Sequence, residues 1–190
     1  DCISPKLDLE THKAVESLID GFKSAGANIN SIQVNDLDIK PCFSCTSQSS
    51  FVFGSKCRCD DDMNTLYPEF RLADIWVFAA HVNTNGSTEY LKNLLDRLEP
   101  LFQPILNSSN PDDIDFETVN MNFGKILLIS SFDKDASDIA EKISDYVNNM
   151  GLLFSKKTGF NILFDERKLD FSQLETIFLT GQNLINNAQN

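Results

Sequence analysis

The chain has 190 residues, of which 42% are hydrophobic and 23% charged, and its net charge is −12. This length suits one domain with a substantial core, so we expect residues 1–190 to form a single domain. The acidic balance argues against a nucleic-acid backbone or an anionic membrane surface as a partner, because both need clustered Lys and Arg.

The apolar pattern predicts strands and helices in alternation. Residues 9–25 have the apolar face of a helix, with Ala14, Leu18 and Phe22 on it, and residues 28–35 alternate as a strand does. Three apolar runs predict further strands, at 74–80, 125–131 and 159–164. Further helices are expected to start near 60–62 and to cover 88–105, 134–150 and 170–187. The segments 41–59 and 106–121 are predicted to be surface loops.

The most specific motifs lie between Cys42 and Arg97. A cysteine loop, Pro41-Cys42-Phe43-Ser44-Cys45, is followed by Cys57-Arg58-Cys59-Asp60-Asp61-Asp62-Met63, an apolar strand and then Leu91-Lys92-Asn93-Leu94-Leu95-Asp96-Arg97. This order resembles the NAD(P)H-dependent FMN reductases and their iron–sulfur flavoprotein relatives, which have a flavodoxin-like fold. The resemblance implies an oxidoreductase that moves a hydride from NAD(P)H to bound FMN and then reduces a small-molecule or protein electron acceptor.

Alternating strands and helices imply an α/β fold with a doubly wound parallel sheet, and the flavodoxin-like order of its strands is 2-1-3-4-5. The first strand then lies between the second and third, and we assign Asp1–Pro5 to the loop that follows it. A central gap would leave backbone groups unpaired, at about 1–3 kcal/mol each when buried. We therefore expect the first strand to be missing from this sequence, either encoded upstream of Asp1 or supplied by another chain.

The resemblance also implies a phosphate site at the start of the first helix. The residues that would hold the FMN phosphate are Ser4, Lys6 and Thr11. Exposed backbone N–H groups at a helix start bind anions, which is the physical basis of such a site. Ile3 stands where the family has glycine, and Asp8 and Glu10 place negative charge where the phosphate would lie. An ordinary capped helix start is the alternative.

Two later loops would face the flavin ring according to the same resemblance. The candidates in the first loop are Ala80, His81, Val82, Asn83 and Gly86, and those in the second are Ser130, Ser131 and Phe132. His81 and Asn83 depart from the family pattern, which has proline and tyrosine there. His81 titrates near neutral pH and would place a proton near the ring, unless it is a solvated loop histidine.

The cysteines resemble the cluster ligands of the iron–sulfur relatives. The candidate ligands are Cys42, Cys45, Cys57 and Cys59, while Gln48 stands at the family's third cysteine. Four thiolates suffice for an iron–sulfur cluster or a zinc ion. Packing without a metal, and a disulfide from Cys42 or Cys45 to Cys57 or Cys59, are the alternatives.

Three functions therefore stay open: a flavin reductase, an electron carrier with FMN and a cluster, and a flavodoxin-like domain that has lost flavin. We interpret Asp96 and Arg97 as a structural charged pair. The family resemblance implies a homodimer or homotetramer. No membrane-spanning run or signal peptide is apparent, so we expect a cytoplasmic protein without a membrane partner.

Overall fold

The computed structural model describes residues 2–4, 8–43, 57, 59–84, 89–101, 105–106, 116–117, 125–153, 157–165 and 171–187. Lys6, Cys45 and Gly86 lie outside these residues, and so does most of the predicted loops at 41–59 and 106–121. The predictions made for these residues stay predictions.

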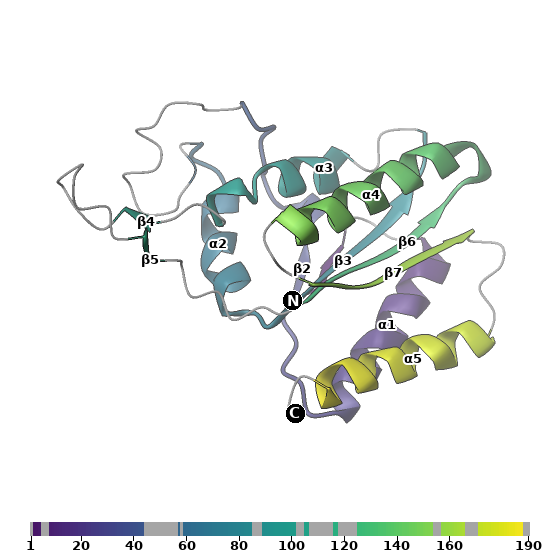
Figure 1. Cartoon of the computed structure of the whole chain (residues 1–190). Helices are drawn as coiled ribbons and strands as arrows, with labels where there is room; N and C mark the ends of the chain where they lie inside the picture. Colours follow the sequence, from purple (N-terminus) through teal and green to yellow (C-terminus); the bar gives the residue numbers. More distant parts are fainter. Residues whose placement is uncertain are drawn as a thin grey trace.

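Five parallel strands form the central sheet. Their order is β2 (Ser31–Gln33), β1 (Cys2–Ser4), β3 (Ile75–Val82), β6 (Lys125–Phe132) and β7 (Lys157–Asp165). Each neighbouring pair runs parallel, as Figure 1 shows for the strands drawn as arrows. The predicted doubly wound sheet with the order 2-1-3-4-5 is therefore confirmed.

The prediction that the first strand is missing upstream of Asp1 was wrong. Cys2–Ser4 is itself the first strand, between β2 and β3: Cys2 lies opposite Ser31 of β2 and Val77 of β3. The family resemblance had indicated the phosphate loop for these residues, one step later in the chain than the structure has it. Ladder pairing uses backbone groups, so three residues between two strands are enough to bridge them.

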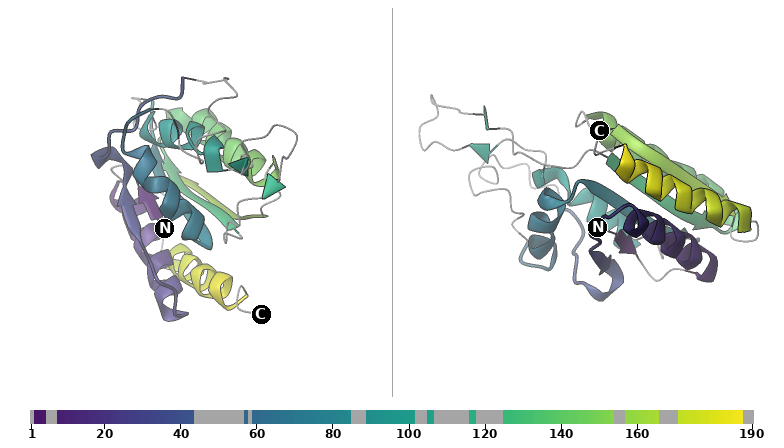
Figure 2. Two further views of the ribbon diagram at one scale, coloured as in Figure 1. Left: turned by 90° about the vertical axis from the view of Figure 1, so that its left-hand side faces the viewer. Right: turned by 90° about the horizontal axis from the view of Figure 1, so that it is seen from below.

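Helices cover both faces of the sheet. Helices α1 (Leu9–Ser24) and α5 (Phe171–Asn186) lie on one face, and α2 (Met63–Leu72), α3 (Glu89–Asp96) and α4 (Ser137–Leu153) lie on the other (Figures 1 and 2). Residues of β3 alternate between these layers: Trp76 and Phe78 pack toward α2 and α3, whereas Val77 and Ala79 pack toward α1 and α5. This explains why the strand sequence is apolar on both faces.

Helices α1 and α5 meet at two glycines. A Cβ atom on Gly21 would lie 2.2 Å from the backbone oxygen of Phe178, and one on Gly181 would lie 2.7 Å from that of Leu18. The two backbones can approach so closely only because neither residue has a side chain.

Three predicted boundaries differ from the structure. Helix α3 ends at Asp96 rather than near 105, because Pro100 has no N–H to donate to the carbonyl of Asp96 and so cannot continue the helix. A short 3-10 turn, Glu99–Leu101, follows, and then a two-stranded antiparallel ribbon of β4 (Ile105–Leu106) and β5 (Phe116–Glu117) within a segment predicted as loop. Helix α4 continues past Gly151, which costs only about 1 kcal/mol inside a helix.

Short 3-10 turns also follow β2 (Val34–Asp36) and precede α4 (Lys134–Ala136). In the part of the chain that the structure describes, no helix has both the length and the apolar character needed to cross a bilayer.

Candidate functional site

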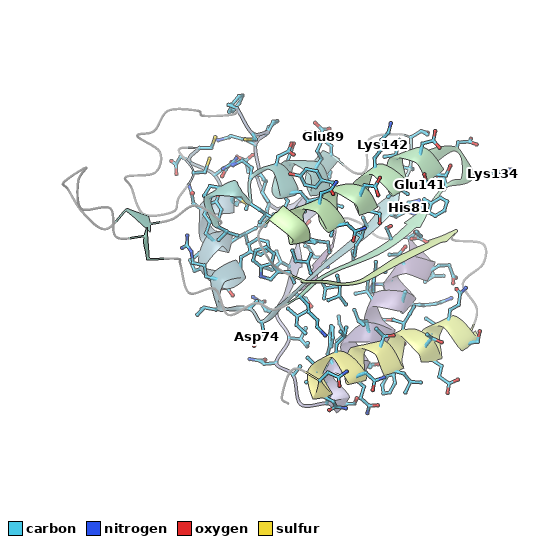
Figure 3. The ribbon with its side chains drawn as sticks, in the orientation of Figure 1. Asp74, His81, Glu89, Lys134, Glu141 and Lys142 are labelled. Carbon is cyan, nitrogen blue, oxygen red and sulfur yellow. The ribbon has the colours of Figure 1, made fainter. Side chains whose placement is uncertain are left out.

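The candidate site lies at the carboxyl edge of the sheet. Strands β3 and β6 end there at Val82 and Phe132, and α1 begins there after β1. The N–H of Asp133 donates to the carbonyl of Val82 at 3.0 Å, which ties the two strand ends together. In Figure 3, His81 lies at this end of the sheet and Asp74, which precedes β3, lies at the other. Because strand order reverses between β1 and β3, this edge is where such folds bind ligands.

Five polar residues converge at this edge, and we call them the Asp8 cluster. They are Asp8, Thr11, His81, Ser131 and Asp133. His81 and Ser131 are direct neighbours in the register of β3 and β6, so their side chains share one face of the sheet. That face is the one against which α1 packs.

Asp8 caps helix α1 and accepts hydrogen bonds from Glu10, Thr11 and Ser131. Its carboxylate accepts the N–H of Glu10 at 3.2 Å and the N–H of Thr11 at 3.3 Å. It also accepts the hydroxyl of Thr11, and the hydroxyl of Ser131 at 2.9 Å. The side chains of Thr11 and Ser131 are fully buried. An oxyanion therefore already occupies the donors at the start of α1.

His81 connects Ser131 with Asp133. Its Nδ1 atom lies 2.8 Å from Ser131 Oγ and 3.4 Å from the Asp8 carboxylate, and its Nε2 atom lies 3.6 Å from the Asp133 carboxylate. Ser131 Oγ donates to the Asp8 carboxylate, and the tautomer of His81 determines which atom donates in the contact between Nδ1 and Ser131 Oγ. His81 is 13% exposed, so one side of the ring remains accessible to solvent.

The pKa of Asp8 is lowered by these contacts. Burial alone would raise it, because a low-dielectric environment disfavours the charged form. The hydrogen bonds from Thr11 and Ser131, the nearby His81 and the N–H of Glu10 outweigh burial and lower the pKa. Asp8 is therefore a carboxylate at neutral pH.

The structure brings together three of the predicted site residues, Thr11, His81 and Ser131. Asp8 had been noted only as an unfavourable charge, although the spacing from Asp8 to Thr11 is that of a helix N-cap. Ala80 and Val82 are buried in the core. Asn83, which follows β3, and Phe132, the last residue of β6, are half-buried. Ser4 ends β1.

Ser130 differs from Ser131 although the two are adjacent and fully buried. It lies on the opposite face of β6, because successive side chains alternate along a strand. Among the described residues its hydroxyl has no hydrogen-bond partner.

The cysteine region is organised around a buried ion pair that the sequence did not indicate. Arg97 forms two hydrogen bonds with Asp61, at 2.8 and 2.9 Å, and one with the carbonyl of Lys40 at 2.9 Å. Both charged side chains are at most 1% exposed. The structural role predicted for Arg97 is therefore supported, but its partner is Asp61, whereas Asp96 pairs with Lys92.

Cys57 and Cys59 lie close enough to this ion pair and to each other to affect the pKa of Cys59. Burial raises the pKa of Cys59, and the cation of Arg97 only partly offsets this effect. Cys42, Cys57 and Cys59 are free thiols. Among the residues that the structure describes, no three Cys, His, Asp or Glu side chains are grouped as metal ligands would be.

The fold and the site edge define the class of this protein: it is a flavodoxin-like α/β protein. The sequence profile of the NADPH-dependent FMN reductases matches residues 4–111, which is more than half of the chain. The chain belongs to this family, and it is an FMN-binding, NAD(P)H-dependent oxidoreductase. The family assignment made from Cys42–Arg97 is confirmed.

Solved structures confirm the fold at low sequence identity. The flavodoxin of Streptococcus pneumonia TIGR4 is 11% identical with a TM-score of 0.55, and the match covers 98% of this chain and 97% of that one. The NAD(P)H:quinone oxidoreductase from Methanothermobacter marburgensis is 12% identical with a TM-score of 0.58, over 100% and 94%. RosB is 17% identical with a TM-score of 0.62, over 99% and 78%. A search of curated proteins finds no match.

Proposed function

We propose that the flavin of this oxidoreductase lies along the carboxyl edge of the sheet, over the Asp8 cluster, and that the acceptor is a small molecule. The observation that carries this proposal is the convergence of Thr11, His81 and Ser131, three residues predicted to contact flavin, at the point where strand order reverses. Ser4, Lys6, Ala80, Val82, Asn83, Gly86, Ser130 and Phe132 stay predicted contacts.

The donors at the start of α1 suit a phosphate in kind. Two backbone N–H groups and two hydroxyls, from Glu10, Thr11 and Ser131, point to one oxyanion, as at helix termini that bind phosphate. The oxyanion they meet is the Asp8 carboxylate. The site therefore fits the phosphate of FMN in its donors but carries a charge that opposes it.

When bound, FMN supplies the hydride-transfer chemistry, and the protein binds and orients it. Thr11 and Ser131 would provide hydroxyl donors at the phosphate end. His81 would hold a proton at the edge of the site, since Nδ1 is tied to Ser131 and Nε2 faces Asp133.

The chain's two histidines offer a matched test. His81 lies in the Asp8 cluster, whereas His12 is 58% exposed on α1 and faces Glu16. Purified protein should show the visible absorption of oxidised flavin or bind added FMN, and should oxidise NADPH when FMN is present. We expect His81→Ala to weaken flavin binding at least fivefold and His12→Ala to leave it unchanged. Equal effects of the two substitutions would refute the proposed position of the flavin.

The Asp8 carboxylate is the feature of the site that opposes FMN. Colourless protein whose melting temperature does not change with excess FMN would contradict the proposed position of the flavin.

An electron carrier with a cluster is a second candidate, and the proximity of Cys57 to Cys59 is the observation that favours it. Iron and zinc analysis of protein purified without oxygen would test it, and metal-free protein that still reduces FMN would reject it.

We also propose a single domain, which suits the length of the chain, and a cytoplasmic location. We further propose a homodimer or homotetramer, as the family resemblance implies. A monomeric mass by light scattering would contradict the proposed oligomer.

A further inference from the structure

We propose that Asp8 acts as a built-in competitor for the flavin phosphate, so that the site takes riboflavin, which lacks the phosphate, more readily than FMN. This inference rests on the proposed position of the flavin. It assigns a specificity-determining role to a residue for which the family resemblance predicts none.

The hydrogen-bond donors at the start of α1 are already occupied by Asp8. The backbone N–H groups of Glu10 and Thr11 and the hydroxyls of Thr11 and Ser131 all donate to the Asp8 carboxylate. A phosphate that used these donors would have to displace Asp8 from them. The displaced carboxylate would lose partners at a site where it is only 18% exposed, so displacement would weaken FMN binding.

A phosphate bound at this position would also meet the negative charge of Asp8. If Asp8 stayed in place, a phosphate dianion would lie next to a carboxylate that neighbouring donors keep ionised. Among the described residues, His81 is the basic side chain within ion-pair distance of Asp8, and it also faces Asp133. Glu10, in the same turn of α1, adds a further negative charge, which is paired with Lys13 at 2.9 Å. Riboflavin carries the same ring and ribityl chain without the phosphate charge, so neither penalty applies to it.

The test compares the dissociation constants of riboflavin and FMN, measured by quenching of flavin fluorescence. Asp8→Asn removes the charge but keeps a residue that caps helices well. Asp20→Asn is the matched control: Asp20 is an exposed carboxylate of the same helix, about 18 Å further along at 1.5 Å per residue. We expect wild-type protein and Asp20→Asn to bind riboflavin at least tenfold more tightly than FMN. Asp8→Asn should bind FMN at least tenfold more tightly than wild type does, with riboflavin affinity unchanged within threefold.

The wild-type comparison needs no variant, so it decides the matter even if Asp8→Asn folds poorly. Wild-type protein that binds FMN as tightly as riboflavin, or an Asp8→Asn variant that folds but gains no affinity for FMN, would overturn the role of Asp8 and leave the proposed flavin position intact. If neither flavin binds to any of the three proteins, the proposed flavin position fails and this inference fails with it.

Discussion

Ser130 and Ser131 provide an internal comparison of what the Asp8 cluster contributes to stability. They are neighbours on β6, both fully buried, and the same substitution by alanine removes one hydroxyl from each. Ser131 donates to Asp8 at 2.9 Å and lies 2.8 Å from His81 Nδ1, whereas Ser130 has no hydrogen-bond partner among the described residues. The two variants should therefore behave differently.

Ser131→Ala should lower the free energy of unfolding by about 2–3 kcal/mol. It removes a hydrogen bond to a charged group, and it leaves both Asp8 and His81 short of a partner in a buried site. For a domain of this length, that loss corresponds to a fall in melting temperature of about 4–12 °C. Ser130→Ala removes a hydroxyl whose desolvation nothing compensates, so it should leave stability unchanged or raise it by up to about 1 kcal/mol.

Urea unfolding followed by the fluorescence of Trp76 would measure both values. Trp76 is the single tryptophan, and it is fully buried with its indole N–H bonded to the carbonyl of Phe70 at 2.8 Å, so its emission will report global unfolding. If Ser131→Ala costs no more than Ser130→Ala, the hydrogen bonds of the Asp8 cluster do not contribute to stability and the reasoning is refuted.

Three further predictions follow from the described contacts. Because the pKa of Asp8 is lowered in the fold, ionised Asp8 stabilises the folded state at neutral pH, and this stabilisation is lost as the pH falls below about 4. Asp8→Asn should therefore make acid unfolding, followed by circular dichroism, less steep. Arg97→Met should lower the free energy of unfolding in urea by about 3–5 kcal/mol, because it leaves the Asp61 carboxylate buried without a cation. Lys92→Met, at a more exposed pair, should lower it by under about 1 kcal/mol. Similar values for the two variants would contradict a stabilising role for the buried ion pair of Arg97 and Asp61. Gly21→Ala should lower the free energy of unfolding by about 1–3 kcal/mol, because the added Cβ would lie 2.2 Å from the carbonyl oxygen of Phe178 in α5. A melting temperature equal to that of the wild type would show that α1 and α5 are not in close contact at this position.

Local pattern was enough to predict most of the architecture. The apolar runs at 74–80 and 125–131 correspond to β3 and β6, because a strand buried on both faces needs apolar residues at every position. The motifs from Cys42 to Arg97 identified the family, since they are specific in both residue type and order. The cap at Asp8 was also open to prediction, because capping depends on residues only two or three positions apart.

The tertiary structure decided the features that depend on distant residues. Cys2–Ser4 forms an interior strand only because β2 and β3 offer backbone partners on both sides, which a sequence of three residues does not indicate. Ser131 meets His81 from 50 residues away and Asp8 from 123 residues away, because strand register and the start of α1 bring them to one edge. Ser131 joins the Asp8 cluster and Ser130 does not, because the two serines lie on opposite faces of β6. Two identical adjacent residues in the sequence do not indicate which of them faces the cluster.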